Sequence, residues 1–188
     1  MTALPKLLVI GGSAGSLDVL LQLLPELESQ WPLAMIIVLH RKNDNDTLLT
    51  ELLSAKTVLP VKDAEEKDVL MPGCIYVAPS DYHLLIEPDG SLTLDASEKV
   101  HYSRPSIDVT FMSAAEVFAA RLYCILLSGA NMDGSEGLQA VHDLGGFTAV
   151  QDPANAEVAF MPRHAMNNVP VDKVLNIREL VAFVKALR

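Results

Sequence analysis

Short apolar runs alternate with amphipathic stretches along most of this chain. The runs over residues 7–10, 33–39 and 122–127 contain no charged residue, and such runs are typical of strands in parallel sheets that are covered on both faces. After the first run, Leu17, Leu20, Leu21 and Leu24 recur at intervals of three and four, which favours an amphipathic helix. The repeated order of strand and helix predicts an α/β fold: a doubly wound, mostly parallel sheet with helices on both faces.

The same patterns give a set of expected elements over one domain, residues 1–188, without repeats or linkers. A hairpin of residues 82–87 and 91–95 around Pro88-Asp-Gly adds an antiparallel pair to this sheet, and residues 41–46 form a polar loop. We expect strands at 7–10, 33–39, 58–62, 74–78, 122–127 and 147–151, and helices from Leu17 to about Glu28, at 47–54, from a Ser106 cap to about Ala120, from Gly134 to about Leu144, at 157–160, at 162–166, and at 177–187 after an Asn176/Glu179 capping box.

A glycine-rich turn, Gly11-Gly-Ser-Ala-Gly15, joins the first strand to the first helix. Free N–H groups at a helix start suit a phosphate, a dinucleotide, or the oxyanion formed when a serine attacks an acyl carbon. No Lys-Ser or Lys-Thr follows the glycines, and Gly-x-Gly-x-x-Gly does not fit. The spelling Gly-x-Ser-x-Gly does fit. Taken alone, the turn leaves an esterase, a nucleotide binder and a purely structural turn open.

Composition limits the partners and the compartment. The formal net charge is -10 and the isoelectric point about 4.8, which disfavours binding to nucleic acid. No apolar stretch approaches the roughly 20 residues of a membrane span, so we expect no membrane insertion. Cys74 and Cys124 lie in apolar, strand-like runs, which indicates buried thiols in a reducing, cytoplasmic setting.

Three polar residues follow predicted strands and are expected to meet. Ser13 and His40 come directly after two of them, and Asp133 lies in the loop after residues 122–127. Because the carboxyl ends of parallel strands share one edge of the sheet, these residues could form a nucleophile, base and acid triad. The backbone N–H of Ala14, joined by one from the loop 128–132, would then form an oxyanion hole.

Simpler interpretations stand beside the triad. A lone His40 is most often a packing residue, and Asp133 with Glu136 has the spacing of a helix cap, a role compatible with a triad acid. Arg104 and Met161 are candidates for the substrate rim, although surface solvation and core packing also explain them. The acidic stretch 63–68 lacks the ligand spacing of a metal site, so we expect neither a metal nor a cofactor.

Six sets of segments follow one another along the chain: Ile10-Gly-Gly-Ser-Ala-Gly-Ser, Val38-Leu-His, Tyr76-Val-Ala-Pro-Ser-Asp-Tyr-His-Leu, Ser103-Arg-Pro-Ser-Ile-Asp, Leu127-Ser-Gly-Ala-Asn-Met-Asp-Gly, and Gln151-Asp with Met161-Pro-Arg. In this order they resemble the catalytic domain of the CheB family, the chemotaxis protein-glutamate methylesterases. The resemblance implies hydrolysis of γ-glutamyl methyl esters on receptor helices, with release of methanol, and deamidation of particular glutamines. It assigns the triad to Ser13, His40 and Asp133, and an oxyanion-hole N–H to Ala130.

Departures from the family pattern affect regulation and specificity. CheB proteins commonly carry an N-terminal receiver domain, whereas this chain begins almost at the first catalytic strand. We therefore expect no phosphorylation control in cis, and a separate receiver or another chemotaxis-pathway protein as partner besides a methylated chemoreceptor. Ala14 stands where the family usually has Thr, and Arg41-Lys42 where Met-Pro is common. A catalytically silent signalling or binding module that keeps the fold is the alternative.

Overall fold

The computed structural model describes residues 5–41 and 47–188, and the loop expected after Arg41 lies outside these ranges. Strand and helix alternate as the apolar runs predict. The elements are β1 Leu7–Gly12, α1 Ser16–Leu23, η1 Leu24–Glu26, β2 Ala34–Leu39, α2 Thr47–Ser54, β3 Val61–Asp63, β4 Ile75–Val77, β5 His83–Ile86, β6 Leu92–Asp95, α3 Ile107–Phe118, η2 Ala119–Arg121, β7 Leu122–Leu126, α4 Ser135–Asp143, β8 Phe147–Gln151, α5 Phe160–Asn168, β9 Lys173–Leu175 and α6 Ile177–Ala186.

The main sheet has seven strands in the order β3-β4-β2-β1-β7-β8-β9, and every pair is parallel. This confirms the predicted doubly wound α/β fold. The central strand β1 pairs with β2 so that Gly12 is opposite Leu39. Ser13 and His40 are the next residues of the two strands, so this register brings them side by side at the carboxyl edge of the sheet.

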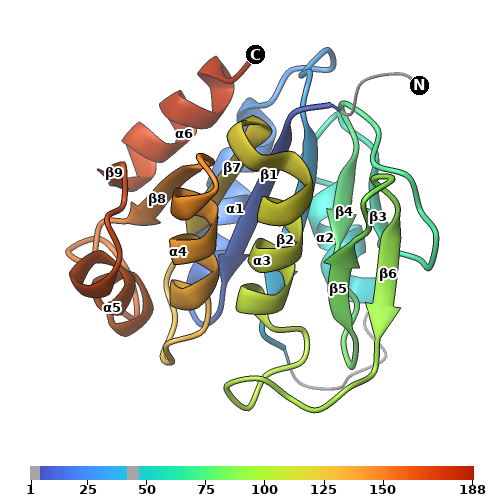
Figure 1. The fold of residues 1–188 in the computed structure, drawn as a ribbon. Helices are drawn as coiled ribbons and strands as arrows, with labels where there is room; N and C mark the ends of the chain where they lie inside the picture. Colours follow the sequence, from blue (N-terminus) through green and yellow to red (C-terminus); the bar gives the residue numbers. More distant parts are fainter. Residues whose placement is uncertain (1–4, 42–46) are drawn as a thin grey trace.

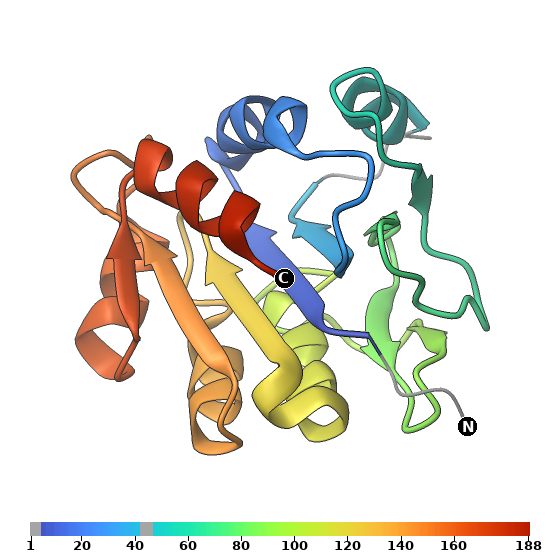
Figure 2. The ribbon, with the colours of Figure 1, turned by 90° about the horizontal axis from the view of Figure 1, so that it is seen from above.

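Helices cover both faces of this sheet (Figures 1 and 2). Helices α3, α4 and α5 lie on one face, and α1, α2 and α6 on the other. Because side chains of a strand alternate between faces, Leu7 and Val9 of β1 belong to one core cluster and Leu8 and Ile10 to the other. All four are fully buried, which explains why the strand sequence is apolar throughout.

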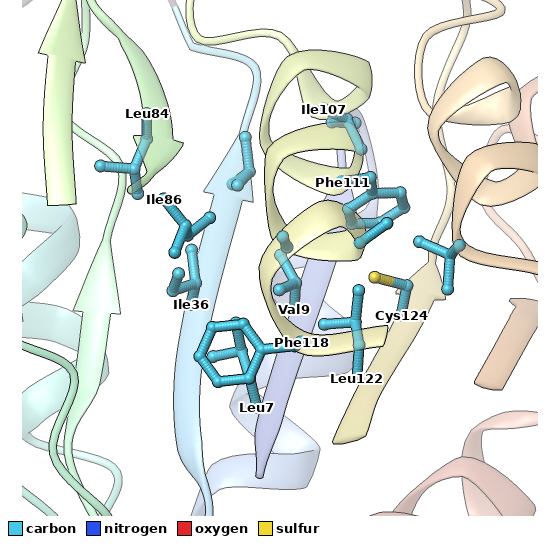
Figure 3. Close-up of a cluster of buried hydrophobic side chains, with 14 of the residues drawn as sticks. Leu7, Val9, Ile36, Leu84, Ile86, Ile107, Phe111, Phe118, Leu122 and Cys124 are labelled. Atoms are coloured by element: carbon cyan, nitrogen blue, oxygen red, sulfur yellow. The ribbon is translucent and has the colours of Figure 1, made fainter. Parts of the chain in front are cut away.

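Helix α3 supplies the two largest fully buried side chains, Phe111 and Phe118, to the core cluster that contains Leu7 and Val9. Figure 3 shows Phe111 and Phe118 packed over β1, and both are fully buried. Phe118→Ala should therefore lower the free energy of unfolding by about 3–5 kcal/mol, measured by urea denaturation. Phe160→Ala, which removes a half-exposed ring, is the control and should cost clearly less. Equal losses would contradict this account of the core.

The hairpin β5-β6 differs from its expected place. It is antiparallel, as predicted, but forms a separate two-stranded sheet instead of joining the main one. Leu84 and Ile86 of β5 and Leu92 of β6 pack into the core cluster that contains Phe111 and Phe118. The hairpin thus covers the same face of the sheet as α3.

Two helix predictions are corrected at prolines. The first helix ends at Leu23 and continues only as the 3-10 turn η1, because Pro25 lacks the N–H that a longer α-helix would use. In place of the two short helices expected at 157–160 and 162–166 there is one helix, α5, which begins only at Phe160 and runs to Asn168, so residues 157–159 are not helical. Pro162 falls in its first turn, where a missing N–H is tolerated. The Asn176/Glu179 capping box is present as predicted.

Candidate active site

The Ser13 turn is tied to the end of strand β7. The Ser13 N–H donates to the Ser128 carbonyl at 2.8 Å and to Ser16 Oγ at 3.1 Å, and Ser16 Oγ donates to the same carbonyl at 2.8 Å. Gly15 has a positive φ of 81°, which favours glycine. The turn is therefore held by fixed contacts, and the Ser13 N–H is already used within the protein.

His40 lies beside this turn and contacts a buried carboxylate. The backbone N–H of His40 donates to the Gly12 carbonyl at 3.1 Å, which fixes the backbone after β2. Its ring Nε2 lies 2.7 Å from Asp133 Oδ2. Because Asp133 occupies Nε2, Nδ1 is the ring nitrogen left to accept a proton from a hydroxyl. Among the described residues, no hydrogen bond joins Ser13 Oγ to the ring, but both residues line the same cavity.

The Asp133 carboxylate is placed by the N-terminus of α3. Oδ1 accepts hydrogen bonds from Ser106 Oγ at 2.8 Å and from the Asp108 N–H at 3.0 Å. Oδ2 accepts from the Ile107 N–H at 2.7 Å, in addition to the contact with His40. The first N–H groups of a helix have no partner within the helix, so this carboxylate satisfies two of them and is held rigidly.

Asp133 does not cap the helix that follows it, contrary to the cap interpretation. The residue at the N-cap of α4 is Gly134, with a φ of 95°, and no side chain caps that helix. The left-handed conformation at Gly134 turns the backbone between Asp133 and α4, so the Asp133 side chain points away from the start of α4. Its side chain contacts α3 instead.

Asp133 is a charged carboxylate despite its complete burial. Burial acts to raise the pKa of Asp133, but the hydrogen bonds from His40 and from the N–H groups of Asp108 and Ile107 outweigh this effect and lower the pKa to about 2. A negative charge at this position stabilises a protonated imidazole. The His40 and Asp133 pair is therefore suited to take up a proton during a reaction.

Ser13 and His40 lie between a basic cavity and an apolar hollow. The basic cavity has a volume of about 450 Å³, and no carboxylate of the described residues lines it. The hollow has a volume of about 330 Å³. The cavity is lined by Ser13, His40, Arg41, Lys99, Tyr102, Ser103 and Arg104, and the hollow by Ser13, Leu17, Leu39, His40, Arg41, Leu48, Leu49 and Leu52.

The backbone N–H groups of Ala14 and Ala130, both near Ser13, have no acceptor within the described part of the protein. The loop of Ala130 runs against Ser13, since a Cβ atom built on Gly129 would be 3.1 Å from the Ser13 Cβ. The Gly129 N–H itself donates to the Val158 carbonyl at 3.0 Å. Ala14 and Ala130 thus offer free donors on the two segments that flank the hydroxyl.

The two expected rim residues have different surroundings. Arg104 lines the cavity, and its Nη1 donates to the carbonyls of Ala96 at 2.7 Å and Ser97 at 2.6 Å. Met161 has no exposed surface, and its Cε would lie 2.5 Å from a Cβ atom on Gly129. It packs behind the Gly129 loop, so the expectation that it forms part of the rim is corrected.

Sequence reasoning missed other residues of the cavity wall. Lys99 and Tyr102 line it, and Tyr102 is 97% exposed. Both lie in the loop before α3, which is yellow-green at the bottom of Figure 1. The loop has no hydrophobic period, and the only available signal was its nearness in sequence to Arg104.

The remaining expectations concern thiols and membranes. Cys124 is fully buried and Cys74 half-buried, and both thiols are free. Burial raises the pKa of Cys124 well above its usual range, so it is a neutral packing group. None of the helices in residues 5–41 and 47–188 combines the length and apolar character that a membrane span requires.

With this geometry described, comparison with known proteins identifies the family. A family model described as CheB methylesterase matches residues 8–184. The chain belongs to the CheB methylesterase family. A solved structure, the Thermotoga maritima CheB methylesterase catalytic domain, superposes on this CheB-family chain with a TM-score of 0.93 at 29% identity, and covers 99% of this chain and 100% of that one.

Named relatives agree with this assignment. A putative protein-glutamate methylesterase/protein-glutamine glutaminase of Leptospira interrogans serogroup Icterohaemorrhagiae serovar copenhageni is 41% identical over 173 residues, which is 92% of this chain and 90% of that protein. The protein-glutamate methylesterase FrzG of Myxococcus xanthus is 34% identical over 176 residues, 94% of this chain but 53% of FrzG. The family resemblance inferred from the motifs is confirmed.

Proposed function

We propose that this CheB-family chain is a protein-glutamate methylesterase, which hydrolyses γ-glutamyl methyl esters on chemoreceptor-like proteins to glutamate and methanol. The observation that carries the proposal is the 2.7 Å contact between His40 and the buried Asp133. His40 and Ser13 line the same basic cavity. Family membership supports the reaction class. The reaction needs water and no cofactor.

In the proposed mechanism Ser13 Oγ attacks the ester carbonyl while His40 Nδ1 takes its proton. Asp133 stabilises the resulting imidazolium. The N–H groups of Ala14 and Ala130 donate to the oxyanion of the tetrahedral intermediate. When the intermediate collapses, His40 returns the proton to the departing methoxide, which leaves as methanol.

The second half of the cycle frees the enzyme. His40 deprotonates a water molecule that attacks the acyl group on Ser13, and the proton then passes to Ser13 Oγ as the glutamate is released. The same cycle on a glutamine amide would release ammonia in the first step, so deamidation of particular glutamines requires no additional group.

The charge of the cavity indicates the kind of substrate. Although the chain carries a net charge of -10, three basic side chains line the cavity: Arg41, Lys99 and Arg104. Such a local excess attracts an acidic protein surface. We propose a cytoplasmic enzyme that acts on glutamate-rich receptor segments, with a separate receiver or another chemotaxis-pathway protein as regulatory partner.

Charge reversal at the cavity tests this recognition. Lys99→Glu should raise KM for a methylated receptor about five- to tenfold with little change in kcat, because an exposed charge contributes about 1 kcal/mol to association and none to the chemical step. Steady-state methanol release measures both constants. Lys56→Glu, an exposed lysine outside the cavity, is the control. An unchanged KM in Lys99→Glu would show that this charge does not contribute to substrate binding.

The esterase proposal itself is tested by methanol release from a receptor fragment carrying γ-glutamyl methyl esters. The wild-type chain should release methanol, and free glutamate side chains should appear in equal amount by mass spectrometry. A folded chain that releases none from any methylated receptor would contradict the proposal.

A further inference from the structure

Three potential metal ligands gather behind the candidate active site. They are one ring nitrogen of His101 and one carboxylate oxygen each from Asp108 and Glu136, and these atoms all lie within 4.8 Å of one another. The residues come from three separate elements: His101 from the loop before α3, Asp108 from α3 and Glu136 from α4. Their spacing in the sequence matches no ligand motif, so only the fold reveals the cluster.

One oxygen in this cluster lacks a hydrogen-bond donor. Asp108 is only 2% exposed, and its Oδ1 accepts from the Gly137 N–H at 2.7 Å. Its Oδ2 is buried without a hydrogen-bond partner among the described residues. His101 Nε2 is 3.3 Å from this oxygen, which is an ion-pair distance but not hydrogen-bond geometry. A buried carboxylate oxygen in this state is costly, and it faces the other two ligands.

The surroundings of the buried Asp108 oxygen point in the same direction. The His101 imidazole lies 3.3 Å from Asp108 Oδ2, and a Glu136 carboxylate oxygen completes a group of ligand atoms within 4.8 Å of one another. A cation at this position would give Asp108 Oδ2 the partner that the described residues do not supply.

We propose that His101, Asp108 and Glu136 bind a divalent transition metal ion, for which Zn²⁺ is the best fit. Zinc accepts both imidazole nitrogen and carboxylate oxygen as ligands, and water can complete a coordination shell of three protein ligands. The imidazole disfavours Mg²⁺ and Ca²⁺, which prefer oxygen ligands throughout.

The position of this site suggests its structural effect. His101 directly precedes Tyr102, which lines the cavity, and the Asp108 N–H donates to Asp133 Oδ1. A bound ion would therefore tie the loop of the cavity wall to the starts of α3 and α4. It would act as a clamp behind the candidate triad, and binding of the ion does not depend on esterase activity.

Calorimetric titration of the metal-free full chain with Zn²⁺ tests the proposal. We expect one ion per chain, and His101→Ala and Glu136→Gln should each weaken binding at least about tenfold, since even outer partners of metal ligands contribute ten- to a hundredfold. Glu116→Gln on α3 removes the same charge from an exposed carboxylate outside the cluster and should bind within about twofold of the wild type.

A second readout uses stability. Zn²⁺ should raise the melting temperature of the wild type and of Glu116→Gln, because an ion bound only to the folded state stabilises it, and it should raise that of Glu136→Gln less. Both ligand variants change side chains that are not buried, and circular dichroism checks their fold. Absence of stoichiometric binding to the wild type would overturn the proposal, and so would equal affinity in Glu136→Gln and Glu116→Gln.

Discussion

Ser13→Ala is expected to lower the rate of methanol release by roughly 10⁶-fold, the loss seen when a triad nucleophile is removed from a serine hydrolase. The nucleophile is lost, whereas the donors on Ala14 and Ala130 and the binding cavity remain, so a small residual rate above that in water should persist. The measurement is kcat on a receptor fragment with γ-glutamyl methyl esters.

The control for this prediction is Ser54→Ala, which removes an exposed hydroxyl at the end of α2 and should leave kcat unchanged. The hydrogen bonds of Ser13 use its backbone N–H and carbonyl, so the alanine variant should melt within a few degrees of the wild type. A folded Ser13→Ala variant with wild-type kcat would show that another group attacks the ester.

Asp133→Asn is expected to lower kcat by about 10⁴-fold, as for the corresponding change in a protease triad, and also to destabilise the fold. Each carboxylate oxygen accepts two hydrogen bonds, from Ser106 and Asp108 on one side and from His40 and Ile107 on the other. An amide has one oxygen and one NH₂ group. Whichever way it turns, the NH₂ group faces two donors.

The stability cost of Asp133→Asn should be about 1–3 kcal/mol for each buried donor left unpaired, measured by urea denaturation beside the kinetics. Asp143→Asn changes an exposed carboxylate on α4 and should alter neither quantity appreciably. If a folded Asp133→Asn variant kept kcat within about tenfold of the wild type, the role proposed for Asp133 would be wrong.

The parallel sheet was predictable because its strands are buried on both faces and are apolar throughout. The closeness of Ser13 and His40 followed from the same pattern, since both residues come directly after strands, and β1 and β2 pair in a register that aligns them. The strand β9 was not predicted, because two of its three residues are exposed and it lacks the buried apolar run of the equally short strand β4.

The surroundings of Asp133 were only partly predictable. Its place in a loop at the carboxyl edge follows from the strand before it. Its hydrogen bonds to the start of α3 join residues more than 20 positions apart in the sequence and arise from how α3 packs on the sheet. The positive φ of Gly134 turns the Asp133 side chain away from α4. The spacing between Asp133 and Glu136 suggested a helix cap instead, and nothing local in the sequence indicated this turn.

The cavity wall was the least predictable part. Met161 lies in a family-like Met-Pro-Arg segment, and nothing local distinguishes a rim residue from a core residue at that position; the close approach of Gly129 decides it. Lys99 and Tyr102 lie in a loop before α3, and loop residues reach a site only through the path of the folded backbone.

The central claim is that Ser13, His40 and Asp133 act together on a methyl ester, with His40 as the group that moves the proton. The most direct measurement is single-turnover methanol release from a methylated receptor fragment by the wild type and by His40→Ala. We expect the wild type to release at least one methanol per active site. A folded His40→Ala variant should release none on the same time scale. Equal release by the two proteins would contradict the account.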